Sequence, residues 1–241
     1  MKYSALIFLM FLIPFQGLTQ FTDDFSDGDF TSNPEWTGET SKFQISTGNK
    51  LQLYDNSESG TAYLSTPSQA INGASWEFLV EFDFNPSSNN YANVFLTSDQ
   101  SNLGGNLNGY FVKIGNTEDE VSLYRQDGSV KTEIIDGTDD RLDMTGVLVS
   151  VKVTRDSVGN WELFSDTLGG TNYYQEGSVT DSTHPMSFYS GVHCEFTSTR
   201  WDKIFFDDFV VTGNAYQDNE RPELNSATVV NSTKLKLQFS E

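Results

Sequence analysis

The fold of this chain is decided by the stretch Ser75-Trp76-Glu77-Phe78-Leu79-Val80-Glu81-Phe82-Asp83-Phe84-Asn85-Pro86. Its large apolar residues occupy every second position from Trp76 to Phe84, and the positions between them are acidic except for Leu79. Because a β-strand points alternate side chains to opposite faces, this spacing predicts a strand over residues 75–85 with one buried and one wet face. The buried face is too apolar for an open edge, so we expect the strand inside a sheet.

Similar alternating segments lie on both sides of this strand. They are separated by turn residues, and none shows sustained helical periodicity. The segments Gln126–Ser129 and Asp156–Gly159 have the composition of hairpin turns. We therefore predict an all-β, two-sheet antiparallel sandwich. The other predicted strands are 43–46, 50–54, 62–65, 91–97, 110–114, 121–125, 130–135, 147–155, 160–165, 188–196 and 203–212.

The composition is strongly acidic. Among 241 residues, 34 are Asp or Glu and 14 are Lys or Arg, which gives a formal net charge of -20. Such a surface repels nucleic acid and anionic membranes, and it is compatible with calcium, cationic partners or neutral sugars. The charge is equally typical of an ordinary soluble extracellular surface. The single cysteine, Cys194, excludes an internal disulfide, and its strand pattern predicts a buried, inert thiol.

The chain ends suggest an exported protein of several modules. Residues 1–20 have the pattern of a signal peptide, with Lys2 ahead of an apolar run that is shorter than the ~20 residues of a membrane span. We expect cleavage near Gln20, no membrane insertion afterwards, and a secreted or cell-surface location. Residues 21–214 then form the main domain, 215–222 a polar linker, and 223–241 the truncated start of another module.

Three segments carry a recognisable pattern: Gly109–Gly115 (GYFVKIG), Val121–Arg125 (VSLYR), and Val151–Asp156 (VKVTRD) followed by Gly159-Asn160-Trp161. They resemble concanavalin A-like jelly rolls, a superfamily of lectins, laminin-G-like domains and family 16 glucanases. The resemblance covers about residues 21–214. The tail Leu235–Glu241 looks like the start of an immunoglobulin-like module, as in secreted bacterial multi-module surface proteins. The resemblance implies a jelly-roll fold and leaves the ligand open, because strand patterns specify a fold better than a function.

A comparison with the glucanases argues against an enzyme. Those that retain configuration carry Glu-x-Asp-x-Glu, or Glu-x-Asp-x-x-Glu, on one strand as nucleophile and acid/base. Glu81 and Asp83 match the first two positions, but Asn85 and Pro86 stand where the last glutamate belongs. We therefore predict no catalytic residues, and a hydrolase is the least favoured alternative.

Binding is the more plausible activity. Sugars are held by aromatic rings together with amide and carboxylate groups, because their faces are apolar and their rims polar. The Gly/Asn-rich loop over residues 98–108 and the strands beside it have this composition. The sequence predicts a non-catalytic glycan-binding or adhesive module, and a purely structural spacer is the alternative. The candidate ligand-binding residues are Asp99, Asn102, Asn106, Tyr110, Tyr124 and Arg125.

Acidic pairs stand at both ends of the main domain. Asp23 and Asp24 open it, and Asp207 and Asp208 close it. The first and last strands of jelly rolls are neighbours in the resembling family, where binding modules hold a calcium ion at this place. Calcium takes six to eight oxygen ligands, so four such carboxylates would supply a good part of a site. The resemblance thus implies a structural calcium ion, and the alternative is that each pair faces water independently.

Overall fold

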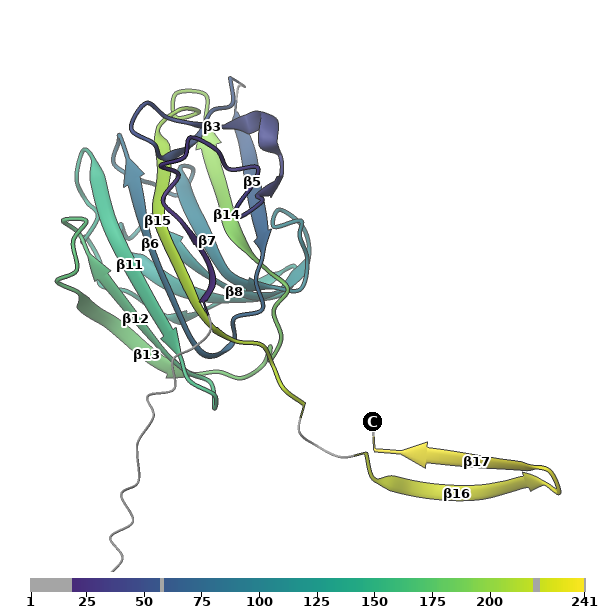
Figure 1. Ribbon diagram of the computed structural model, residues 1–241. Helices are drawn as coiled ribbons and strands as arrows, with labels where there is room; N and C mark the ends of the chain where they lie inside the picture. The colour runs from purple at the N-terminus through teal and green to yellow at the C-terminus, as the bar shows by residue number, and fades with distance from the viewer. Residues whose placement is uncertain (1–18, 57–58, 219–221, 241) are drawn as a thin grey trace, which may run out of the picture.

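The computed structural model describes residues 19–56, 59–218 and 222–240. Residues up to 214 form two antiparallel sheets packed face to face (Figure 1). One sheet has the strand order β13-β12-β11-β6-β15-β4-β3 with β1 paired to β15, and the other has the order β10-β9-β8-β7-β14-β5-β2. This is the antiparallel sandwich that the alternating pattern predicts.

The two sheets consist of these strands: β1 Thr19–Asp23, β2 Thr37–Gly38, β3 Phe43–Ile45, β4 Leu51–Leu53, β5 Ser59–Pro67, β6 Asn72–Phe82, β7 Tyr91–Ser98, β8 Leu107–Ile114, β9 Val121–Gly128, β10 Val130–Ile135, β11 Val147–Arg155, β12 Asn160–Asp166, β13 Tyr174–Thr180, β14 Tyr189–Thr197 and β15 Ile204–Asn214. A short 3₁₀ turn, η1, covers Thr40–Lys42. Both predicted hairpin turns join strand pairs, β9 with β10 and β11 with β12.

Strand β6 lies in the interior of the eight-stranded sheet, between β11 and β15. The alternating apolar residues of the deciding stretch are at most 3 % exposed and belong to the main core: Trp76, Phe78, Val80, Phe82 and Phe84. The strand ends at Phe82 rather than at residue 85, so that part of the prediction was wrong. Pro86 has no N–H to donate to a ladder, and the amide of Asp83 bonds instead to the carbonyl of Lys203 at 3.1 Å.

The main core fills the space between the sheets. Aromatic rings link its two halves: Trp161 stacks on Trp76 at 5.6 Å between ring centroids, and Tyr110 of the opposite sheet lies 4.5 Å from Trp161. Cys194 is fully buried here, as predicted. Burying so many large rings supplies most of the stability that a chain without a disulfide needs.

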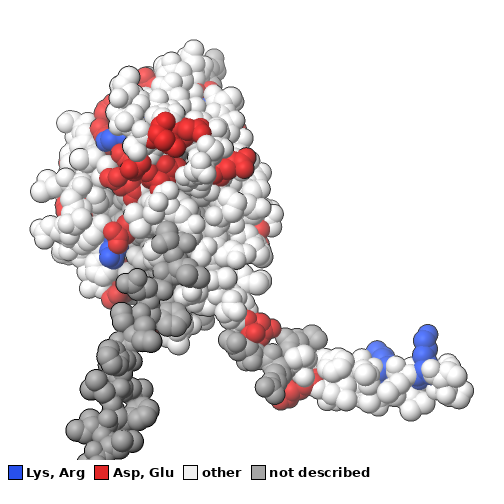
Figure 2. All heavy atoms as spheres, in the orientation of Figure 1, with Lys and Arg blue, Asp and Glu red and all other residues white. Residues whose placement is uncertain are grey.

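The two ends of the domain meet. Strand β1 pairs antiparallel with β15, and Asp23 lies opposite Phe209. Beneath this pair, Trp36 packs against Phe209 at 5.2 Å. The expected neighbourhood of first and last strands is therefore confirmed. Acidic side chains gather on the face where β1 crosses β15, as the space-filling view shows (Figure 2).

Four strands were not predicted: β1, β2, β13 and β16. The edge strand β13 is mostly exposed and carries a glycine, so it lacks the apolar alternation that marks a strand. Beyond the linker, β16 (Leu224–Asn231) and β17 (Lys234–Phe239) form a separate two-stranded sheet whose residues are all exposed (Figure 1). Such a hairpin has little stability alone.

The signal peptide prediction falls almost wholly on residues 1–18, which lie outside the described residues. Strand β1 begins at Thr19, just ahead of the expected domain boundary at Phe21. The side chain of Gln20 donates to the carbonyl of Gly213 at 3.0 Å and accepts from the amide of Gln69 at 3.2 Å. No helix in the described ranges has the length and apolar character to cross a membrane.

Candidate functional site

The outer face of the seven-stranded sheet, which points away from the other sheet, carries a second apolar cluster. Strand β8 sends Tyr110 and Val112 into the main core and Phe111 to the outer face. The Gly/Asn-rich loop folds back over this face, where Leu103 and Leu107 pack with Phe95 and Phe111. Tyr63 and Tyr124 pack partly buried against the same cluster, so aromatic surface is held here in a fixed arrangement.

A cavity of about 140 Å³ opens beside this outer cluster. Strands β7 to β10 each contribute to its wall, and the residue types are three aromatic rings, two lysines and one amide. The lining residues are Tyr91, Asn93, Phe111, Lys113, Tyr124 and Lys131. Flat rings combined with groups that donate and accept hydrogen bonds are the chemistry that sugar binding requires.

The charged groups of this cavity are arranged around the rings. Lys113 Nζ lies 4.2 Å from the centroid of the Tyr91 ring and 6.0 Å from that of Tyr124, and Lys131 Nζ lies 5.5 Å from that of Phe111. Such cation–π contacts hold an ammonium group over a ring without neutralising it. Desolvation lowers the pKa of both lysines, and the charge of Lys113 lowers the pKa of Lys131 further.

The wall of the cavity rests on a buried polar pair. Asn93 is 1 % exposed and His193 is 7 % exposed. The Asn93 amide nitrogen lies 3.4 Å from His193 Nδ1, while its Oδ1 atom is buried without a hydrogen-bond partner among the described residues. Burial lowers the pKa of His193 to about 4, so the imidazole is neutral at pH 7.

The structure places four of the six predicted ligand-binding residues on or beside this face. Tyr124 lines the cavity and stacks on Phe111 at 5.3 Å. The loop residues Asp99, Asn102 and Asn106 are exposed or partly exposed. Asp99 accepts from the backbone and side-chain amides of Asn108, and Asn102 Oδ1 accepts from the amide of Gly104 at 3.0 Å. Two of the three loop side chains therefore shape the loop itself.

The other two predicted residues, Tyr110 and Arg125, lie opposite each other on the inner face of the sheet. Tyr110 has no exposed surface, and its hydroxyl donates to Asp181 Oδ1 at 2.6 Å. Arg125 forms ion pairs with Asp127 and Asp181. The ring of Tyr110 thus offers no face to a sugar, and the guanidinium group of Arg125 is already paired. The structure does not bring these two to the cavity.

The residues that line the cavity and that the sequence reasoning missed are Tyr91, Asn93, Phe111, Lys113 and Lys131. A signal for them exists: Tyr91 and Asn93 alternate on β7, and Phe111 and Lys113 alternate on β8. In each pair an aromatic residue and a polar residue share a face.

A larger hollow of about 780 Å³ lies on the other sheet, at the ends of β6, β11 and β12. Its wall includes Trp161, which is fully buried, and Arg155, which is 4 % exposed. The indole is covered by Tyr110 and Trp76, so it presents no ring face to a ligand. This hollow fits a sugar less well than the smaller cavity.

The glucanase-like pair lies on the outer face of the eight-stranded sheet. Glu81 forms an ion pair with Lys50 at 2.5 Å, and Asp83 is exposed beyond the end of β6. Asn85 donates to Asp143 Oδ1 at 2.8 Å. Asn85 and Pro86 stand where the motif has its acid/base glutamate, so this strand does not carry the pair of catalytic carboxyl groups that double displacement uses.

The aspartates at the chain ends line a hollow of about 470 Å³, which includes Asp23, Asp24 and Asp208. Both carboxylate oxygens of Asp23 accept hydrogen bonds, from the amide of Phe25 at 2.9 Å and from Trp36 Nε1 at 2.8 Å. Asp24 accepts from the amide and the hydroxyl of Ser26. Burial raises the pKa of Asp207 to about 6, and the charges of Asp208 and Asp24 contribute to the rise.

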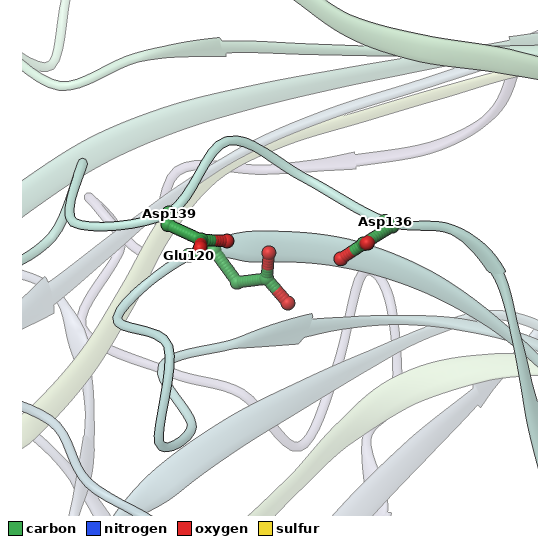
Figure 3. A group of neighbouring side chains, drawn as sticks. All are labelled: Glu120, Asp136 and Asp139. Carbon is green, nitrogen blue, oxygen red and sulfur yellow. The ribbon is translucent and has the colours of Figure 1, made fainter.

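A second acidic group was not predicted. Glu120, just before β9, and Asp136 and Asp139, after β10, direct carboxylates toward one another (Figure 3). Three oxygens of the group, one from each residue, lie within 4.8 Å of one another. Glu120 is 1 % exposed, and its Oε1 atom accepts from Asn116 and Ser122 while its Oε2 atom is buried without a partner among the described residues. Burial raises the pKa of this carboxyl group.

Comparison with known structures identifies the architecture. The lumenal domain of VIP36, in a form bound to Ca²⁺ and Man3GlcNAc, superposes with a TM-score of 0.59 at 14% sequence identity. The match covers 82% of this chain and 90% of that one. The fold is a concanavalin A-like jelly roll. No family model matches the chain, and no curated protein matches it in sequence.

Two further jelly rolls extend the comparison. The carbohydrate recognition domain of Emp47p matches with a TM-score of 0.58 at 10% identity, over 84% of this chain and 99% of that one. The carbohydrate-binding module CBM66 from Bacillus subtilis matches with a TM-score of 0.53 at 12% identity, over 74% of this chain and 95% of that one. At such identities the likeness concerns the fold alone.

Proposed function

We propose that residues 21–214 form a non-catalytic extracellular module that binds glycans through the outer face of the seven-stranded sheet. The observation that carries this proposal is the cavity in which Tyr91, Tyr124 and Phe111 meet Asn93 and two lysines. The faces of the half-buried Tyr91 and Tyr124 rings would pack against the apolar side of a pyranose, and the ammonium groups would bond its rim. The jelly rolls that this chain resembles in structure include carbohydrate recognition and carbohydrate-binding domains, which supports the proposal.

The test is a glycan array probed with the chain and with two single variants. Tyr124→Ala removes a ring that lines the cavity, and Tyr54→Ala removes an exposed ring on the other sheet. We expect saturable binding that Tyr124→Ala weakens by roughly tenfold and Tyr54→Ala leaves unchanged, since one stacked aromatic contributes about 1 kcal/mol or more. Absence of binding to every glycan would favour the alternative of a structural spacer.

A structural calcium ion belongs to the same proposal. The predicted place, among Asp23, Asp24, Asp207 and Asp208, stays a candidate. The group of Glu120, Asp136 and Asp139 is a second one, supported by the unpartnered buried oxygen of Glu120. Carbonyl oxygens and water would complete either set, because calcium takes six to eight oxygens.

The remaining parts of the proposal concern the whole protein. We propose export by a signal peptide, a place outside the cell or on its surface, and an immunoglobulin-like module that begins near residue 223. The exposed apolar residues of the β16–β17 hairpin, including Leu235 and Phe239, support a further module because they need a partner to bury them.

A further inference from the structure

The cavity on the outer face is lined by two lysines and by no acidic residue, in a protein that is strongly anionic overall. Lys113 and Lys131 belong to only 14 basic residues against 34 acidic ones. In the described part of the chain, three other lysines pair with carboxylates: Lys42 with Glu39 and Asp55, Lys50 with Glu81, and Lys152 with Glu77. Within the described ranges, neither cavity lysine forms such an ion pair.

The positive charges of the two ammonium groups also repel each other. Both have a lowered pKa because neighbouring atoms displace water from them, and Lys113 contributes to the shift of Lys131. Two like charges that act on each other are stabilised when an anion enters between them, although the exposure of Lys131 lets water screen part of this effect. The cavity therefore favours a negatively charged group.

The nearby glutamates act on the lysines by their charge but form no direct ion pair with them among the described residues. The hydroxyl of Tyr91 donates to Glu195 Oε2, and Tyr124 bonds to Glu133, so both carboxylates are engaged with the phenols beside the lysines. They do act on Lys113 from a distance, as do Glu118 and Glu120. The negative charge of these surrounding glutamates lowers the affinity of the cavity for a small free anion. The anion must arrive on a ligand that makes further contacts.

The walls supply those contacts. The rings of Tyr91 and Tyr124 offer apolar surface on either side of Lys113. With about 140 Å³, the cavity is well below the roughly 300–1,000 Å³ of a drug-sized pocket, so it admits one charged substituent and the edge of one ring.

We propose that the cavity selects acidic glycans by taking a carboxylate or sulfate group between Lys113 and Lys131. This inference rests on the proposed glycan binding and specifies which class of glycan would bind, namely an acidic one. It differs from what the net charge of -20 favours, which is a neutral ligand.

Binding of short oligosaccharides, measured by calorimetry, tests the proposal. Short ligands limit the long-range repulsion from the acidic surface. The probes are trigalacturonate, the same trisaccharide with its carboxyl groups reduced to alcohols, and a sulfated galactose trisaccharide beside its unsulfated form. We expect at least one acidic member to bind about tenfold more tightly than its neutral counterpart, as one charge-assisted contact provides. The two pairs distinguish carboxylate from sulfate.

The double variant Lys113→Met/Lys131→Met should lose the preference for the acidic member, and Lys152→Met, a lysine on the other sheet, should keep it. Equal affinities within both pairs, or a preference that survives in the double variant, would overturn this inference and leave glycan binding intact. If an array of neutral and acidic glycans shows no binding at all, the proposed function itself fails. Inorganic sulfate that binds as tightly as the sulfated sugar would show an adventitious ion only.

Discussion

The Nδ1 atom of His193 lies 3.4 Å from the amide nitrogen of Asn93, and both side chains are almost completely buried. Burial, with a smaller contribution from the charge of Lys131, lowers the pKa of His193 from 6.5 to about 4. An amide donor facing Nδ1 fits the neutral ring. The wall of the cavity therefore depends on a neutral imidazole, and protonation of His193 at low pH would destabilise it.

The first prediction concerns acid stability. Between pH 6.5 and pH 4 the unfolded chain binds a proton at this histidine and the folded chain does not, so the free energy of unfolding falls as the pH falls. The loss approaches about 3 kcal/mol at the acid end. Urea unfolding of the wild type and of His193→Asn at pH 7 and pH 4.5 measures it, since asparagine keeps an acceptor near Nδ1. Parallel pH dependences in the two proteins would contradict the prediction.

The second prediction concerns Asp207, whose effect has the opposite sign. Its pKa of about 6 in the folded chain lies above the ordinary 3.8, so its contribution to stability is largest below pH 3.8 and is lost as the pH rises through 6. At pH 7 the buried charge is a cost. Asp207→Asn should therefore raise the free energy of unfolding at pH 7 by about 1–2 kcal/mol, after a reduction for its partial exposure.

Chemical denaturation of the wild type and of Asp207→Asn, in chelator at pH 7 and pH 4, checks this second prediction. The gain should shrink toward zero at the lower pH, where the native carboxyl is protonated. Asp202→Asn, on the preceding turn, is a matched control. A destabilised Asp207→Asn at pH 7 would refute the expected sign.

The third prediction is calcium-dependent melting. Free calcium at 100 times its dissociation constant should stabilise the fold by about 2.7 kcal/mol, or roughly 5–11 °C in melting temperature for a domain of this size. Asp208→Ala should abolish the shift if the ion lies at the chain ends, and Glu120→Gln should abolish it if the ion lies beside β9. Identical melting temperatures of the wild type in calcium and in chelator would end the calcium proposal.

The sequence predicted the fold well because the relevant signal is local. In β6 every second residue from Trp76 to Phe82 faces the core, and a period of two is visible in any short window. The end of β6 was harder to predict: the alternation continues to Phe84, which stays buried, while the backbone leaves the ladder after Phe82.

The outer face that carries the proposed binding cavity was harder to predict because both faces of β8 are apolar. Tyr110 and Val112 alternate with Phe111, so the period of two separates the faces without showing which one meets the other sheet. The acidic group of Glu120, Asp136 and Asp139 was hard to predict for another reason: its residues are brought together by the pairing of β9 with β10. The β9–β10 ladder shifts register between Glu133 and Ile135 just before Asp136, and the residue pattern does not show such a bulge.

The pairing of β1 with β15 also bears on how the chain folds. Its first strand finds its partner only when nearly the whole domain has been synthesised, and β6 likewise awaits β11 and β15. Ladders between residues so distant in sequence form slowly, because the entropy of closing a long loop is lost before the contacts reward it. A nascent chain of this topology would complete neither ladder until its last strand is made, which would suit the proposed export as an extended polypeptide.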